Sequence, residues 1–80
     1  MTYYGPLAPP ATLGERITSV RTALRLTLQD VADSVGVSAP AVFYWENDSV
    51  IPRPQRLEAV AAALYLTVPE LLGAHSHLQA

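Results

Sequence analysis

Apolar residues between positions 27 and 46 recur at helical spacing in two short groups, with a single glycine between them. Residues three or four positions apart lie on the same face of a helix. The apolar positions that share a face are Val31, Ala32 and Val35 in the first group and Val42 and Trp45 in the second. The pattern predicts two amphipathic helices joined by a tight turn, the second of them over residues 39–46.

The residues that flank these two groups support the same division. Thr27 and Ser38 are residue types that cap helix N-termini, and Asp30 stands three residues after Thr27, as in a short capping box. Gly36 can adopt the left-handed conformation that ends a helix. Pro40 falls in the first turn of the second helix, where a missing N–H costs little. These end signals predict the same helix boundaries as the apolar spacing.

Similar signals predict three more helices. Thr12 with Glu15 and Thr67 with Glu70 repeat the capping-box spacing, and Pro54 marks the start of a helix between them. The expected inward-facing residues are Leu13, Ile17, Val20 and Leu24 in the first helix and Leu57, Val60, Ala61 and Leu64 in the fourth. The predicted fold class is therefore all-α, with five helices in one domain over residues 12–73.

The segments outside this domain carry no helical pattern. Residues 1–11 are rich in proline and are expected to form an extended arm, and residues 74–80 are expected to form a flexible tail. His75 and His77 are an isolated pair, whereas a metal site needs three or four ligands. No catalytic set or phosphate-binding glycine loop is recognisable, so we expect neither an enzyme nor a bound metal or cofactor.

Composition places the chain among small globular proteins. Of the 80 residues, 50% are hydrophobic and 15% are charged, and cysteine is absent. There is no signal peptide and no apolar run long enough to span a membrane, so we expect a cytoplasmic protein without a membrane partner. The formal net charge of −2 argues against nucleic-acid binding, since nucleic-acid binders usually carry a basic surface.

The segment T-L-Q-D-V-A-D-S-V-G-V-S-A-P-A-V-F-Y-W-E resembles the helix-turn-helix of the Cro/repressor-type (XRE) family of bacterial and phage DNA-binding proteins. The resemblance extends from Leu13 to Gly73, through L-G-E-R-I-T-S-V-R before this segment and T-V-P-E-L-L-G after it. It implies a five-helix, lambda-repressor-like DNA-binding domain whose helix over residues 39–46 enters the major groove. It also implies a structural salt bridge between Arg21 in the first helix and Glu46 at the end of the third.

The resemblance assigns DNA base contacts to the outward positions of this helix, which are expected to be Ala39, Pro40, Phe43 and Tyr44. Family members usually carry polar side chains at several of these positions, whereas here nearly all are apolar. Direct readout normally uses Arg or Lys for guanine and Asn or Gln for adenine, and none of these types occurs in the helix. Two interpretations stay open: apolar contacts with thymine methyl groups plus one tyrosine hydroxyl, or a protein-binding patch of exposed aromatic residues.

Phosphate contacts are expected mainly around the start of the fourth helix, because family members commonly bind phosphate from this region. The candidate residues are Arg53, Arg56, Gln29, Asn47, Ser49 and Arg16. Gln29 is a substitute, since the family commonly has Gln where Leu28 stands here. The family often has glycine at the positions of Asp48 and Tyr65. The charge of Asp48 is expected to weaken DNA binding and make it strongly salt-dependent, and Tyr65 predicts an altered junction between the fourth and fifth helices.

Taken together, these observations predict a sequence-specific DNA-binding transcriptional regulator, a repressor or Cro-like switch of bacterial or phage origin. One domain with few contacts binds weakly, so a homodimer on a two-fold site in double-stranded DNA is expected. Its contacts would come from the Tyr3–Tyr4 arm or from the apolar residues Leu66, Val68, Leu71 and Leu78. The alternative is a protein-interaction module, antitoxin-like or anti-repressor, that binds a protein partner through the apolar face of the helix over residues 39–46.

Overall fold

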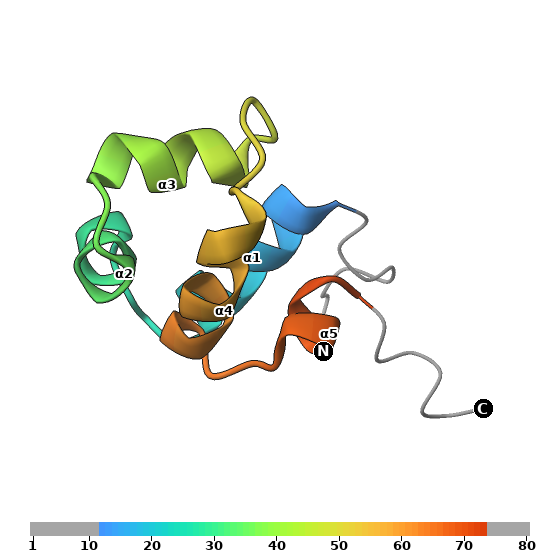
Figure 1. The fold of residues 1–80 in the computed structure, drawn as a ribbon. Coiled ribbons are helices and arrows are strands. Elements are labelled where there is room, and N and C mark those ends of the chain that lie inside the picture. Colours follow the sequence, from blue (N-terminus) through green and yellow to red (C-terminus); the bar gives the residue numbers. More distant parts are fainter. Residues whose placement is uncertain (1–11, 74–80) are drawn as a thin grey trace.

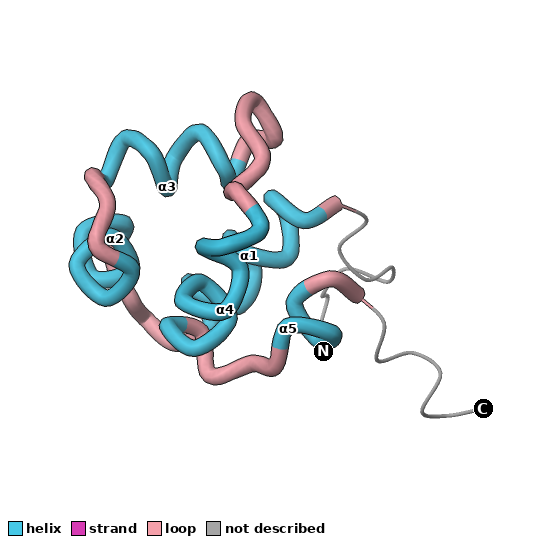
Figure 2. Tube along the Cα trace, viewed as in Figure 1, coloured by secondary structure: helices cyan, strands magenta, loops and turns pink. Residues whose placement is uncertain are grey.

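The computed structural model describes residues 12–73, so the expected arm over residues 1–11 and tail over residues 74–80 lie outside the described residues. Within this range the chain forms five helices: α1 Leu13–Ala23, α2 Leu28–Val35, α3 Ala39–Glu46, α4 Pro54–Ala63 and α5 Val68–Leu71. Figure 2 shows only helices and loops in this part of the chain, as the all-α prediction requires. None of the helices in residues 12–73 is long and apolar enough to cross a membrane.

The helices pack as a small bundle in which α3 lies along one side (Figure 1). α2 packs beneath one end of α3 and α1 beneath the other, while α4 contacts α2 and α5. α5 contacts α1 and α4 on the far side of the molecule from α3. This arrangement leaves the outer side of α3 uncovered by the other helices.

Every helix contributes to a single hydrophobic core. Its buried members are Ile17, Val31, Ala32, Val35, Val42, Trp45, Val60, Ala61, Leu64 and Leu71. The apolar faces predicted for α2, α3 and α4 are therefore confirmed. The prediction for Leu24 was wrong, because α1 ends at Ala23 and Leu24 is its C-cap residue, with 38% of its surface exposed.

The predicted helix starts are confirmed in detail. Capping boxes, in which the N-cap hydroxyl and the N3 carboxylate each accept a backbone N–H, open α1, α2 and α5. Ser38 caps α3 by accepting the N–H of Ala41 at 3.3 Å. In α2, the backbone N–H of Thr27 and then its side-chain hydroxyl hold the pKa of Asp30 below its usual value, so this carboxylate stays charged.

Each helix is followed closely by a residue in the left-handed conformation, which satisfies the last carbonyl groups of the helix. Glycine fills this position after α2 and α5, at Gly36 and Gly73. After α1, α3 and α4 the position is taken by Arg25, Asp48 and Tyr65, with φ values of 62°, 63° and 60°. At the junction between α4 and α5, Tyr65 thus adopts the left-handed conformation that glycine usually supplies, and the altered junction stays a prediction.

Candidate nucleic-acid interface

The turn between α2 and α3 sets the direction of α3. Gly36 has φ 88°, and its N–H and that of Val37 both donate to the carbonyl of Ala32, at 2.8 and 3.0 Å. Val37 is half-buried and packs against the core, which fixes the corner between the two helices. This is a helix-turn-helix geometry, in which the second helix projects from the surface of the first.

The core holds α3 from its inner face. Val42 and Trp45 are buried, whereas Pro40, Phe43 and Tyr44 are exposed on the other side, with half of the Phe43 and Tyr44 surfaces accessible. The spacing of these three exposed residues, i, i+3 and i+4, places them on one helix face. The rings of Phe43 and Tyr44 lie 5.9 Å apart, centroid to centroid, with their planes tilted by 59°.

Ala39 was expected on the same outward face, but the structure places it differently. It is half-buried and packs against the hydrophobic core at the start of α3. Its methyl group therefore offers less surface to a ligand than the other three residues do. The exposed face of α3 consists of Pro40, Phe43 and Tyr44.

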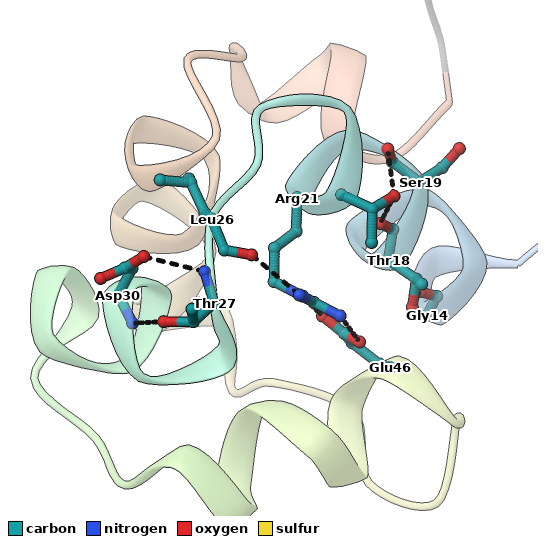
Figure 3. A network of polar contacts seen from close by, with 9 residues as sticks. Gly14, Thr18, Ser19, Arg21, Leu26, Thr27, Asp30 and Glu46 are labelled. Atoms are coloured by element: carbon teal, nitrogen blue, oxygen red, sulfur yellow. Dashed lines mark hydrogen bonds and ion pairs between the residues drawn. The ribbon is translucent and has the colours of Figure 1, made fainter.

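The expected ion pair between α1 and the end of α3 is present in the structure (Figure 3). Arg21 donates from Nε to Glu46 at 2.5 Å and from a second nitrogen at 3.1 Å, and its third nitrogen donates to the Leu26 carbonyl at 2.9 Å. The two side chains are only 16% and 9% exposed. Glu46 raises the pKa of Arg21 above its usual value, chiefly through the hydrogen bonds. The pair ties three segments together and fixes α3 relative to α1.

The start of α1 approaches the end of α3 closely at Gly14. A Cβ atom at this position would lie 2.6 Å from the Trp45 carbonyl oxygen and 2.7 Å from Asp48 Oδ1. Only a residue without a side chain fits such an approach. Together with the ion pair, this contact anchors the C-terminal end of α3.

Asp48 has a structural role that its sequence position did not reveal. Its carboxylate accepts the hydroxyl of Thr12 at 2.7 Å and the backbone N–H of Gly14 at 3.0 Å. Both donors belong to the N-terminal end of α1, where a negative charge is favourable. The charge that was expected to oppose a phosphate is thus stabilised by two donors and a helix N-terminus.

Arg53 and Arg56 lie at the start of α4, directly after the connection from α3, and both are exposed. They line a surface hollow together with Gln55 and Ala59. Arg53 is the N-cap residue of α4 and makes no side-chain capping bond. Two exposed guanidinium side chains therefore lie together at the N-terminal end of α4.

The other phosphate candidates already have partners inside the domain. Gln29 Nε2 donates to Asp33 at 2.8 Å, and Arg16 Nε donates to the Leu71 carbonyl at 2.7 Å, which ties α1 to α5. Asn47 Oδ1 accepts the backbone N–H of Ser49 at 3.1 Å, a bond that uses the acceptor atom of Asn47 and not its Nδ2 donor. Arg16 thus has a structural role, because it connects α1 to α5.

Carboxylates are distributed unevenly among the helix N-termini. Glu15, Asp30 and Glu70 stand in the first turns of α1, α2 and α5, where each accepts the N–H of its N-cap residue. The first turns of α3 and α4 contain no acidic residue. A helix N-terminus carries partial positive charge and attracts anions. Among the helices of residues 12–73, only α3 and α4 have no carboxylate in their first turn to offset the partial positive charge of the helix N-terminus.

Sequence reasoning missed two exposed apolar residues in the connection between α3 and α4. Val50 and Ile51 are 50% and 75% exposed, and the N–H of Val50 donates to the Tyr44 carbonyl at 3.3 Å. Their position in a polar N-D-S-V-I-P connection, outside any helical period, was the available signal. They add exposed apolar side chains to the connection that follows α3.

The residues expected at a dimer surface are only partly available. Leu71 is fully buried in the core of its own domain, so its assignment to dimer contacts was wrong. Leu66 and Val68 are half-buried, and Tyr65 and Leu72 are exposed nearby. Leu78 and the Tyr3–Tyr4 arm lie outside the described residues.

Comparison with known proteins agrees with this geometry. A family model described as helix-turn-helix matches residues 17–71. The P22 c2 repressor protein, solved in complex with synthetic operator 9T in the presence of Tl⁺, has a TM-score of 0.76 and 31% sequence identity over 80% of this chain and 97% of its own. No curated protein matches the chain significantly.

Two further solved structures are also similar. The solution structure of the DNA-binding domain of the P22 c2 repressor (1–76) has a TM-score of 0.77 and 29% identity, covering 85% of this chain and 90% of its own. A SinR protein/SinI protein complex gives 0.71 and 28%, covering 86% and 67%. Because the family model covers more than half of the chain and the repressor domains share its fold, the chain belongs to the Cro/repressor-type (XRE) helix-turn-helix family.

Proposed function

We propose that this protein is a sequence-specific DNA-binding transcriptional regulator, a repressor or Cro-like switch of bacterial or phage origin, that places α3 in the major groove of double-stranded DNA. The observation that carries the proposal is the exposed face of α3, held from behind by Val42 and Trp45 and locked at its end by the Arg21–Glu46 pair. In helix-turn-helix proteins the second helix enters the groove. The P22 c2 repressor, solved with a synthetic operator, supports DNA as the ligand class.

Arg53 and Arg56 are the proposed main phosphate contacts. Both are exposed at a helix N-terminus that has no carboxylate of its own, directly after the connection from α3. Asn47 and Ser49 assist from this connection, whereas Gln29 and Arg16 contribute less because each side chain already donates a hydrogen bond inside the domain. The domain therefore binds DNA through a small local basic site, despite its overall charge of −2.

A domain with so few phosphate contacts binds weakly alone, so we propose that it acts as a homodimer on a two-fold site. The proposed contact consists of two exposed apolar residues, Tyr65 after the end of α4 and Leu72 at the end of α5, together with the half-buried Leu66 and Val68. Size-exclusion chromatography with light scattering at high micromolar concentration tests this. A monomer at that concentration, with and without DNA, would refute the dimer.

Fluorescence anisotropy tests the DNA-binding proposal directly. The protein is titrated into a duplex from the region upstream of its own gene and into a scrambled duplex, at about 50 and 200 mM salt, the range over which phosphate-driven affinity falls steeply. We expect tighter binding to the native duplex that persists at the higher salt. If the native and scrambled duplexes bind equally and binding disappears at the higher salt, the upstream region contains no operator for this protein.

A charge-matched pair of variants identifies the phosphate contacts. Arg53→Ala, or Arg56→Ala, should weaken binding to every duplex and reduce the slope of log affinity against log salt by about 0.9 for each lost contact. Arg25→Ala removes the same charge from an exposed position at the end of α1, away from the start of α4. Equal effects of Arg25→Ala and Arg53→Ala would show that net charge, and not the site at α4, governs binding.

A protein-interaction module is the second candidate function, favoured by four exposed apolar residues in α3 and the connection after it, Phe43, Tyr44, Val50 and Ile51. Exposed aromatic and aliphatic groups of this kind commonly anchor protein interfaces. A structural neighbour, SinR, was solved in complex with the SinI protein. An Arg53→Ala/Arg56→Ala variant would retain a protein partner held by this surface, but it would lose DNA.

A further inference from the structure

The exposed face of α3 offers almost no hydrogen-bonding groups. It consists of Pro40, Phe43 and Tyr44, and the hydroxyl of Tyr44 is its single polar side-chain group. Within the helix, Val42 and Trp45 are buried and Ala39 packs against the core, so they add no polar side-chain group to this face. Apart from this one hydroxyl, recognition by the face rests on apolar contact.

The major groove contains one apolar feature. Guanine, adenine and cytosine present oxygen, nitrogen and amino groups there, whereas thymine also presents the methyl group at C5. A face without amide or guanidinium groups cannot make the bidentate hydrogen bonds that usually distinguish the polar edges of the bases. It can cover the methyl group, and the tilted rings of Phe43 and Tyr44 provide two differently oriented apolar surfaces for doing so.

We propose that α3 recognises 5-methylpyrimidines, and that Phe43 and Tyr44 read the C5 methyl groups of thymine or of 5-methylcytosine. This inference rests on the DNA-binding function proposed above. Because 5-methylcytosine carries its methyl group at the same ring position as thymine, a methylated cytosine substitutes for thymine in the site. DNA binding by this protein therefore responds to cytosine-5 methylation of its target.

The charges near α3 are compatible with DNA as the ligand of this face. The two carboxylates at its C-terminal end are both engaged inside the domain, Glu46 by Arg21 and Asp48 by donors at the start of α1. The exposed cations Arg53 and Arg56 follow at the start of α4. The carboxylates at the end of α3 are thus engaged, and two exposed cations follow the helix in the chain. This arrangement suits a polyanion and favours bases over a hydrophobic protein partner for Phe43 and Tyr44.

The test begins with selection of duplexes from a random double-stranded library by the full-length protein. The best-bound duplex is then made in four forms: as selected, with uracil replacing thymine, with C·G pairs replacing its T·A pairs, and with 5-methylcytosine in those C·G pairs. Uracil keeps every hydrogen-bonding group of thymine and lacks only the methyl group. Burying a methyl group contributes about 0.8 kcal/mol, so each contacted methyl should change the Kd about fourfold.

We expect the uracil duplex to bind at least fourfold more weakly than the selected duplex, and the 5-methylcytosine duplex to bind more tightly than its unmethylated form by a similar factor. Phe43→Ala should remove most of the difference between thymine and uracil. Leu24→Ala, which removes an apolar side chain that is 38% exposed at the C-cap of α1, should leave that difference unchanged. Fluorescence of the buried Trp45 reports whether each variant is folded.

Two results would overturn the inference and are distinguishable from each other. If the selected duplex binds sequence-specifically but equally well with thymine and uracil, methyl recognition is wrong while the DNA-binding function stands. If selection enriches no duplex, both proposals fail. A folded Phe43→Ala variant that keeps the full difference between thymine and uracil would likewise contradict recognition by Phe43.

Discussion

The Arg21–Glu46 pair should stabilise the position of α3, and a double-mutant cycle can measure the coupling free energy between the two side chains. Arg21→Met keeps the aliphatic stem but removes three hydrogen bonds, two to Glu46 and one to the carbonyl of Leu26. Glu46→Gln keeps the size of its side chain and removes the charge. The double variant removes both charges at once.

The magnitude follows from burial and geometry. Exposed ion pairs contribute about 0–1 kcal/mol, whereas breaking a buried pair by removing one partner costs about 3–5 kcal/mol. With side chains 16% and 9% exposed, this pair lies near the buried limit but keeps some solvent contact. We therefore expect Arg21→Met to lower the free energy of unfolding by about 3 kcal/mol, with a coupling energy of about 2 kcal/mol in the cycle. A domain of this size has only about 4–12 kcal/mol in total.

Urea denaturation followed by tryptophan fluorescence and circular dichroism provides the assay. Trp45 is the single tryptophan of the chain and lies buried in α3, one residue before Glu46, so its emission reports on the locked helix itself. Glu46→Gln is the milder variant that keeps the cycle measurable if Arg21→Met is largely unfolded. A coupling energy below about 1 kcal/mol, the value for an exposed pair, would refute the proposed lock.

Three further changes test the helix ends. Asp48→Ala removes the acceptor for both donors at the start of α1 and should cost about 1–2 kcal/mol of stability, so an unchanged urea midpoint would contradict its capping role. Tyr65→Gly should raise the free energy of unfolding, measured by urea denaturation, by up to about 1 kcal/mol, because glycine adopts φ 60° without strain. Gly36→Ala should lower the same free energy by about 1–2 kcal/mol, because alanine is strained at φ 88° even though the space around the added Cβ is open. Hydrogen bonds lower the pKa of Asp30 in the folded state, so the charged carboxylate stabilises the fold fully above about pH 4. This contribution is lost as the pH falls through the lowered pKa, and the unfolding free energies of the wild type and Asp30→Asn should converge there.

The fold could be predicted from the sequence because its signals are local. Three capping boxes, the glycine after α2 and the spacing of apolar residues each depend on residues within a few positions of one another. The exposure of Leu24 was missed, since α1 ends just before it and Arg25 occupies a left-handed position that sequence rules assign to glycine. Such a position is tolerated because neighbouring contacts outweigh a local cost of about 1–2 kcal/mol.

The candidate site was harder to predict from the sequence, because its features depend on contacts between segments that are distant in the chain. Asp48 and Thr12 are far apart in the chain, and so are Arg16 and Leu71, whose hydrogen bond decides which arginines remain for a ligand. The Arg21–Glu46 pair was expected only because a resemblance supplied it. Exposure along α3 followed from helical periodicity, but the half-buried state of Ala39 depends on how the turn packs.

The engagement of the carboxylates limits how the protein can evolve. Five of the seven acidic residues, Glu15, Asp30, Glu46, Asp48 and Glu70, hold helix starts or the ion pair. A lineage under selection for tighter binding to a polyanion could not simply discard negative charge, because most such mutations would weaken the fold. Adaptation is therefore directed toward gaining cations on the exposed surfaces of α3 and α4, or toward loss of Glu58, which is exposed on α4 and caps no helix within residues 12–73.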